Sequence, residues 1–151
     1  MQEYTVKVYN HKTEWYQHGE FHRIDGPAVE CNTGDRHWYQ NGRYHRLDGP
    51  AVEYANGDRH WYQDGKLHRI DGPAVECNTG YTAWFQDGKR HRIDGPAIEY
   101  AEGNKEWWID GKWWIDGTEY TEEEFNEKTQ SKQLSVAEIE KLLGYKIKII
   151  A

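Results

Sequence analysis

The sequence predicts a mainly β protein, in which 23-residue β-hairpin repeats form a single antiparallel meander sheet and a small C-terminal α-helical cap follows. Three observations support this fold class. The stretch HRIDGPAVE that begins at His22 returns nearly unchanged at His45, His68 and His91, at a constant interval. Asn-Gly or Asp-Gly pairs, which favour two-residue hairpin turns, recur at the same interval. The C-terminal segment lacks the repeat and carries helix-start signals.

A period of this length indicates an array whose units stack on one another, because a single unit cannot bury its own apolar surface. We expect the array over residues 1–118 and a helical capping tail with a final strand over 119–151. The array divides into a half unit at 1–13, full units at 14–36, 37–59, 60–82 and 83–105, and a degraded unit at 106–118.

Each unit is predicted to run strand, turn, strand. In HWYQ-NG-RYHR the two-residue turn at Asn41-Gly42 places Tyr39 opposite Tyr44 and Trp38 opposite His45. The Asp-Gly-Pro that follows bends the chain or forms a bulge, since Pro cannot donate a hydrogen bond to the ladder. The segment AVEY then continues as a strand, and ANGD turns the chain back.

Alternation along the strands assigns side chains to two faces. We expect a core face that combines a Trp row with the aliphatic residue after each His-Arg pair: Trp15, Trp38, Trp61, Trp84 and Trp107, with Ile24, Leu47, Ile70 and Ile93. A further row is expected to join this face, although its register across the Pro bend stays open: Val29, Val52, Val75 and Ile98. The other face is expected to carry an aromatic row, an Arg row and an Asp row: Tyr16, Tyr39, Tyr62 and Phe85; Arg23, Arg46, Arg69 and Arg92; Asp25, Asp48, Asp71 and Asp94.

The tail carries two helix-start signals. Thr121 and Glu124 form one capping box, and Ser135 and Glu138 form another. Gly144 is placed as a helix C-cap, and the alternating YKIKII after it predicts a strand. We expect this cap to cover the open end of the sheet.

Composition excludes several classes of function. The net charge is −7, so bulk nucleic acid and anionic membranes are not expected partners. No apolar run is long enough to span a bilayer, and the first residues do not resemble a secretory signal, so we expect a cytoplasmic protein. Cys31 and Cys77 lie two units apart, about 19 Å at two strands a unit, which predicts free thiols. No spacing predicts a metal site, and no cofactor is expected.

The repeated His-Arg-x-Asp motif is the first candidate for chemistry, as at His22, Arg23 and Asp25. An active site, however, needs one asymmetric constellation, whereas this motif occurs in four equal copies. We therefore interpret it as structural, with each Arg paired to an Asp of its own or the next unit and each His bonded to backbone beside a Trp. No catalytic residue and no enzyme activity are predicted.

The aromatic and Arg rows are the better candidate for a binding site, because rings beside guanidinium groups suit bases, nucleotides or an acidic protein surface. The alternative is that these side chains only cover the second face of the sheet. Differences between units, as at Phe21, Tyr44, Leu67 and Arg90, locate specificity or, equally well, reflect drift without selection. The candidate binding residues are Arg23, Arg46, Arg69, Arg92, Tyr16, Tyr39, Tyr62, Phe85, His37, His60, Trp108 and Trp113.

A hairpin unit with Trp-Tyr, Asn/Asp-Gly and a His-containing strand resembles the MORN repeat, with HRxDGPA in place of its Gly-rich segment. The fuller pattern, with its WWIDGK and TEEEFN ending, is similar to small accessory repeat proteins of tailed bacteriophages. This resemblance implies a phage protein in the cytoplasm of an infected bacterium and a scaffold for protein contacts.

Three hypotheses of function follow. The first is a non-enzymatic protein-binding module that occupies and blocks a host protein, such as a defence component. The second is a sponge that binds a small nucleotide signal through the Arg/Tyr face. The third is a structural scaffold that self-assembles into a homo-oligomer through exposed sheet edges.

Overall fold

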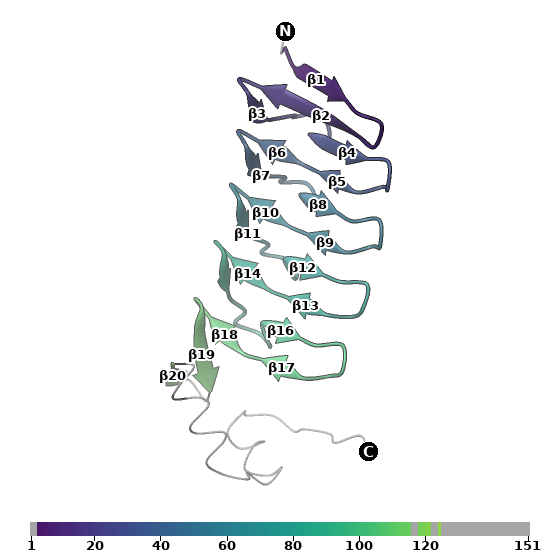
Figure 1. Ribbon diagram of the computed structural model, residues 1–151. Helices are drawn as coiled ribbons and strands as arrows, with labels where there is room; N and C mark the ends of the chain where they lie inside the picture. Colours follow the sequence, from purple (N-terminus) through teal and green to yellow (C-terminus); the bar gives the residue numbers. More distant parts are fainter. Residues whose placement is uncertain (1–2, 116–117, 122–123, 125–151) are drawn as a thin grey trace.

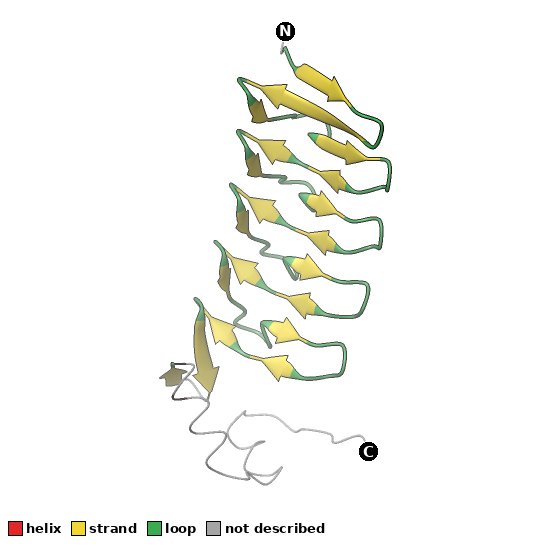
Figure 2. Cartoon of the chain, viewed as in Figure 1, coloured by secondary structure: helices red, strands yellow, loops and turns green. Residues whose placement is uncertain are grey.

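The computed structural model describes residues 3–115, 118–121 and 124, and it confirms the mainly β fold class, with a large antiparallel meander sheet built from hairpin strands (Figure 1). The strands form two columns that run side by side along the array. Loops behind the sheet connect one column to the other, and the tight turns line up along the two outer edges (Figure 2).

The first column is an 11-stranded sheet in the order β1-β2-β4-β5-β8-β9-β12-β13-β16-β17, with β3 paired to β2. Its strands are β1 Thr5–Val8, β2 Lys12–Gln17, β3 Glu20–Phe21, β4 Val29–Cys31, β5 Arg36–His37, β8 Val52–Glu53, β9 Arg59–His60, β12 Val75–Glu76, β13 Thr82–Ala83, β16 Ile98–Glu99 and β17 Lys105–Glu106.

The second column consists of hairpins, one for each unit after the first full one, that pair as predicted. Its strands are β6 Tyr39–Gln40, β7 Arg43–Tyr44, β10 Tyr62–Gln63, β11 Lys66–Leu67, β14 Phe85–Gln86, β15 Lys89–Arg90, β18 Trp108–Ile109, β19 Lys112–Ile115 and β20 Thr118–Tyr120. Backbone hydrogen bonds join each hairpin to the next: the Gly65 amide donates to the Tyr44 carbonyl at 2.9 Å and the Arg46 amide to the Tyr62 carbonyl at 3.1 Å.

The two-residue turns have the backbone geometry that the sequence predicts. Asn41 and Gly42 both have positive φ, at 50° and 70°, as a type I′ turn requires. The turn pairs Tyr39 with Tyr44, in the predicted register. Local turn chemistry therefore sets the register of every hairpin in the array.

The loop from each Arg to the following Ala leaves the sheet and returns behind it. The Trp at the bend between the columns holds both ends of this loop. In the second unit the Trp38 amide donates to the Ala51 carbonyl at 2.8 Å, and the His45 amide donates to the Trp38 carbonyl at 3.1 Å. The space under the loop admits only a small side chain, since the Ala at this position has no exposed surface in any unit: Ala28, Ala51, Ala74 and Ala97.

The predicted core face is wrong in two of its rows. The aliphatic residues after each His-Arg pair are exposed instead of buried: Ile24 57%, Leu47 75%, Ile70 79% and Ile93 80%. The Val row is largely buried, but on the side of the Tyr row, because Val52 pairs directly with His37 and His60 across the ladder. Both errors have one cause: the Asp-Gly-Pro loop leaves the sheet, so alternation cannot be counted through it.

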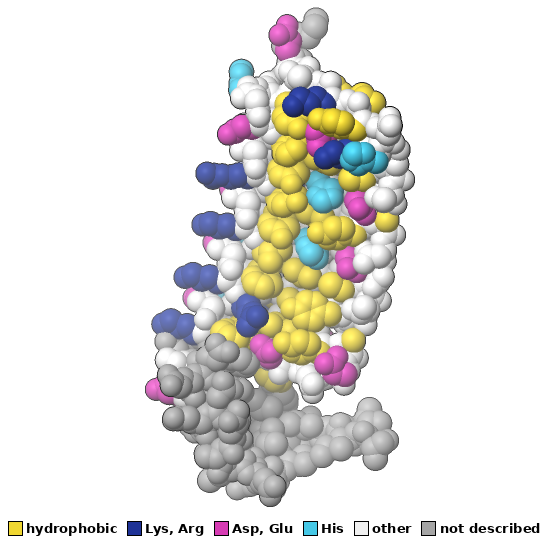
Figure 3. All heavy atoms as spheres, viewed as in Figure 1, with side chains coloured by type: hydrophobic (Ala, Val, Ile, Leu, Met, Phe, Trp, Pro, Cys, Tyr) yellow, Lys and Arg dark blue, Asp and Glu magenta, His cyan; other side chains and the backbone are white. Residues whose placement is uncertain are grey.

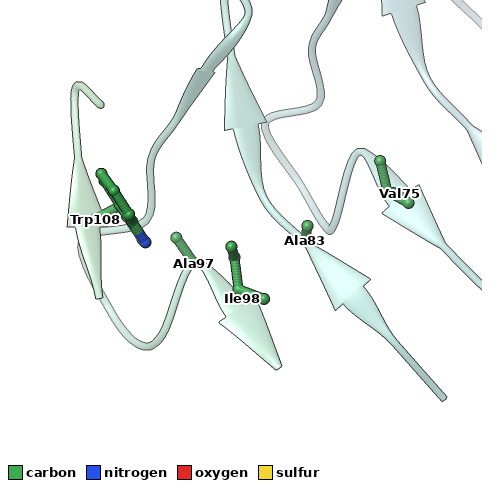
Figure 4. Packing of buried hydrophobic residues seen from close by; sticks show 5 residues of the cluster. All are labelled: Val75, Ala83, Ala97, Ile98 and Trp108. Carbon is green, nitrogen blue, oxygen red and sulfur yellow. The ribbon is translucent and has the colours of Figure 1, made fainter. Parts of the chain in front are cut away.

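Buried apolar residues form one cluster at the C-terminal half of the array (Figure 4). Ile98 and Ala83 are fully buried there, and Trp108 closes the cluster with 7% of its surface exposed. Half-buried rings pack around this cluster, so the core is aromatic at its margin and aliphatic at its centre.

The first predicted capping box is present. The Glu124 amide donates to Thr121 Oγ1 at 3.2 Å, and the Glu124 carboxylate accepts from the Thr121 amide at 2.8 Å. The rest of the predicted tail, which includes the second capping box and the final strand, lies outside the described residues. Among the residues that are described, no helix has the length and apolar character to cross a bilayer.

Candidate functional site

The Arg of each repeat is bound within its own unit, as Arg46 illustrates. Its guanidinium stacks on the Trp38 ring, 4.0 Å from the centroid. Nε donates to Asp48 at 2.9 Å, and Nη1 donates to the Pro50 carbonyl at 3.2 Å and to Glu53 at 3.1 Å. The guanidinium lowers the pKa of the Asp48 carboxyl through this hydrogen bond and its charge. The ring, carboxylate and Pro-carbonyl contacts recur at Arg23, Arg69 and Arg92.

The Gly of the motif is required by this packing. A Cβ added at Gly49 would lie 2.9 Å from the guanidinium carbon of Arg46, closer than side chains approach one another. The Pro that follows supplies the carbonyl that the guanidinium binds. The motif Arg-x-Asp-Gly-Pro therefore forms a loop that its own Arg holds against a Trp ring.

The His of the motif connects each unit to the next. Nδ1 of His45 lies 3.2 Å from the backbone amide of Asp64 and 3.0 Å from its carboxylate. His22 makes the equivalent pair of contacts with Asn41. Two expected contacts of the motif are confirmed: the Arg pairs with the Asp of its own unit, and the His bonds to backbone.

The Arg and Tyr rows do not share a face, contrary to the sequence prediction. The guanidinium groups lie against the Trp rings, and neighbouring residues such as Trp38 and Tyr39 point to opposite sides of a strand. Arg23, Arg46, Arg69 and Arg92 are therefore separated from Tyr16, Tyr39, Tyr62 and Phe85. The hypothesis that the chain binds a small nucleotide relied on Arg and Tyr side chains on one surface, and these two rows lie on opposite sides of the sheet.

The aromatic row forms a continuous stack that we call the tyrosine spine: Tyr16, Phe21, Tyr39, Tyr44 and Tyr62. Successive ring centroids are 4.7, 5.1, 4.3 and 5.1 Å apart. All five side chains are half-buried, so the rings cover the sheet and keep part of their surface in solvent. Figure 3 shows hydrophobic side chains in one column along the array, with Lys and Arg side chains along the adjacent edge.

Equivalent positions continue the tyrosine spine with other side chains: Leu67, Phe85, Arg90 and Trp108. Here Arg90 replaces a ring, and its guanidinium lies 4.7 Å from the Trp108 centroid and 3.7 Å from Glu106. Trp113 pairs with Trp108 through the backbone, but its side chain lies outside what the structure describes. The predicted candidates Tyr16, Tyr39, Tyr62, Phe85 and Trp108 thus lie along one row of the sheet.

Beside the spine, His37 and His60 enclose the Tyr54 ring edge-on, at centroid distances of 5.9 and 5.4 Å. His37 Nδ1 also lies 3.3 Å from the Tyr44 hydroxyl. Partial burial lowers the pKa of both imidazoles and so favours their neutral form. The two predicted candidates His37 and His60 therefore belong to the same surface as the spine, which together with Tyr54 we call the tyrosine face.

Three hydroxyl groups of the spine, those of Tyr16, Tyr39 and Tyr62, have raised pKa values. Burial raises the pKa of Tyr39 and Tyr62. A hydrogen bond to Glu14 raises the pKa of Tyr16 to about 12. The tyrosine face is thus a surface of neutral rings and hydroxyls, with little formal charge at its centre.

Three grooves lie on the opposite side of the sheet, one between each pair of successive Asp-Gly-Pro loops. They enclose about 740, 580 and 550 Å³. Each is lined by the loop of one unit and by the Trp, Gln, His and Arg of the next, as with Trp61, Gln63, His68 and Arg69 in the middle groove. Exposed Ile or Leu side chains form the lips.

Sequence reasoning missed part of the tyrosine face. Phe21 and Tyr44 stood out only as variable positions, and Tyr54 was not a candidate. The signal was present, because a two-residue turn places Tyr44 directly opposite Tyr39, and cross-strand rings stack. The lip residues were missed because they were assigned to the core.

Within the described part of the chain, no three His, Cys, Asp or Glu side chains are grouped so as to hold a metal ion. Cys31 and Cys77 are free thiols, as predicted, and burial raises the pKa of both. No protein-family model, curated protein or solved structure matches this chain. The resemblance to MORN-like phage proteins remains a prediction.

Proposed function

We propose that this chain is a non-enzymatic protein-binding repeat module that presents the tyrosine face to a folded partner protein. The observation that carries the proposal is the spine, in which rings contact one another in an unbroken row from Tyr16 to Tyr62 and keep part of their surface in solvent. Aromatic side chains are the residues that contribute most to protein interfaces, because a large ring is buried at a small cost in side-chain entropy.

The size of the tyrosine face fits a protein better than a small ligand. The row that starts in the tyrosine face at Tyr16 and continues through Leu67, Phe85 and Arg90 to Trp108 spans four units, which is about 38 Å at two strands a unit. Across the array, six extended residues give the face a width of about 20 Å. The resulting area of about 760 Å² is close to the roughly 800 Å² that each partner contributes to a standard interface.

The stacking itself argues against a nucleotide as the ligand. The Tyr39 and Tyr44 rings stack at 4.3 Å, and the Phe21 and Tyr39 rings lie tilted against each other at 5.1 Å, so the ring faces lie mainly against one another. A base would need an open ring face on which to stack. Ring edges and neutral hydroxyls suit instead the mixed apolar and hydrogen-bonding surface of a folded protein.

The differences between units support one asymmetric partner. The position occupied by His37 and His60 carries Ala83 in the next unit and Glu106 in the last. From the resemblance to phage-encoded repeat proteins we infer a host protein, which this chain occupies and blocks in the bacterial cytoplasm.

The test uses a matched pair of variants, one on each side of the sheet. Tyr54→Asp places a carboxylate on the tyrosine face, and Leu47→Asp places one on an exposed groove lip; Tyr54 is 39% and Leu47 75% exposed. Immobilised wild type and Leu47→Asp should retain the same stoichiometric protein from a bacterial lysate, and Tyr54→Asp should lose it. Calorimetry with the purified partner should then give a 1:1 complex. Equal retention by Tyr54→Asp, or no stoichiometric protein at all, contradicts the proposal.

A further inference from the structure

The three grooves on the Trp side form a second, periodic surface that the proposed function does not use. They are equivalent in sequence and recur once a unit, so their spacing is that of two strands, about 9.6 Å. A ligand that fills all three must present the same group at this interval and from one side.

Among regular backbone conformations, polyproline II matches this spacing best. Three residues of polyproline II advance about 9.3 Å and return a side chain to the same side of the helix. An α-helix needs seven residues and advances about 10.5 Å, which accumulates roughly 1.8 Å of mismatch over two intervals. Side chains on one side of a β-strand recur about every 6.7 Å, so the second side chain would meet the wall between two grooves instead of a groove.

The floor of each groove offers donors to a backbone that has only acceptors. The indole N–H groups of Trp38, Trp61 and Trp84 have no hydrogen-bond partner among the described residues, and neither do the side-chain amides of Gln40, Gln63 and Gln86. These donors are not sealed inside the fold, since His22 Nε2 is the one buried polar side-chain atom left unbonded in the described chain. A polyproline II backbone exposes carbonyl groups that make no internal hydrogen bonds, and Pro itself has no N–H.

The charge of the grooves favours an uncharged ligand. Each groove is lined by as many Arg as carboxylate side chains, and the Arg of each motif is paired within its own unit. Each groove also presents Trp, Gln and His side chains between aliphatic lips, such as Leu47 and Ile70 at the middle groove, which the exposed Arg59 lines as well. Proline rings pack well against aromatic and aliphatic surfaces, and their preformed helix loses little entropy on binding.

We propose that the Trp side of the array binds an uncharged proline-rich segment in the polyproline II conformation. The segment runs along the array and places residues i, i+3 and i+6 in the three grooves. This is a second binding surface, on the opposite side of the sheet from the tyrosine face, so either proposal can fail without the other.

The experiment is fluorescence polarisation with fluorescein-labelled oligoprolines of four, seven and ten residues. Affinity should rise steeply from four to seven residues, as further grooves are filled, and much less from seven to ten. A seven-residue Gly-Ser peptide serves as the ligand control and should not saturate. The double variant Leu47→Asp/Ile70→Asp, which carries a carboxylate on each lip of the middle groove, should weaken the seven-residue peptide at least about tenfold. Tyr54→Asp, on the tyrosine face, should bind it as wild type does.

Three outcomes would overturn the proposal: no saturable oligoproline binding up to millimolar concentration, equal binding of the Gly-Ser peptide, or unchanged affinity in the double variant. Sedimentation of the wild type and the double variant addresses the competing occupant, a second copy of this chain. A wild-type dimer that dissociates when Leu47 and Ile70 are replaced would show that these residues mediate self-association. That result would also overturn the proposal. Unfolding curves of both variants establish that each is folded.

Discussion

The two sides of the sheet differ in what they repeat. On the Trp side every full unit carries the same Arg, Asp, Gly and Pro, and the contacts of Arg46 recur at Arg23, Arg69 and Arg92. On the tyrosine side the same register carries different residues from unit to unit, as where Tyr44 gives way to Leu67 and then to Arg90. Residues that are identical in every full unit hold the Asp-Gly-Pro loop in place, whereas residues that vary make the tyrosine side differ from one unit to the next.

The largest effect on stability is expected for Arg46→Ala, on the Trp side, where the contacts recur in every full unit. This substitution leaves the Pro50 carbonyl and Glu53 without their donor and removes the stacking on Trp38. We expect the free energy of unfolding to fall by about 3 kcal/mol. Urea denaturation measures it, with Arg43→Ala, an exposed Arg of the adjacent hairpin, as the control that should change stability by under about 0.5 kcal/mol. Equal effects of the two substitutions would show that the guanidinium contacts do not close the unit.

A smaller loss is expected for Gly49→Ala, about 2 kcal/mol, because the new Cβ would lie 2.9 Å from the Arg46 guanidinium carbon. The physical cause can be isolated with a double-mutant cycle. In the Arg46→Ala background the same substitution should cost little, since the atom that it meets is gone. Additive losses would instead indicate backbone strain at Gly49.

The tyrosine face should respond to pH. Burial lowers the pKa of His37 and His60 below the ordinary value of 6.5, so the unfolded chain takes up these protons at a higher pH than the folded chain. The free energy of unfolding should therefore be highest above pH 6.5 and fall as the pH drops through that value. Denaturation of wild type and of the His37→Gln/His60→Gln variant at pH 7.5 and 5.5 measures the difference. The variant should lose less stability than wild type, and an equal loss would contradict burial as the cause.

The smallest effect is expected for Ile70→Thr, which should change stability by less than about 0.5 kcal/mol because Ile70 is 79% exposed. Ile98→Ala is the matched reference, since Ile98 has no exposed surface and should cost about 3 kcal/mol. A large loss at Ile70 would restore the core face that the sequence predicted.

Much of the fold could be predicted because its signals are local. The Asn41-Gly42 turn and the Tyr39–Tyr44 pair follow from residues that are neighbours in the chain. The candidate site was predicted in part: His37 and His60 join the aromatic row, whereas the Arg row lies on the other side of the sheet. Tyr54 was missed because its contacts lie across strands of different hairpins.

The sequence by itself determined the period, the turns and the hairpin register, since each depends on backbone preferences over a few residues. Only the tertiary structure decided which rows share a face. The Asp-Gly-Pro loop leaves the sheet, so the two-residue alternation of a strand loses its phase there. The phase is set again by contacts between distant residues: Arg46 closes on Trp38, Val52 packs between His37 and His60, and Leu47 is left on the lip of a groove.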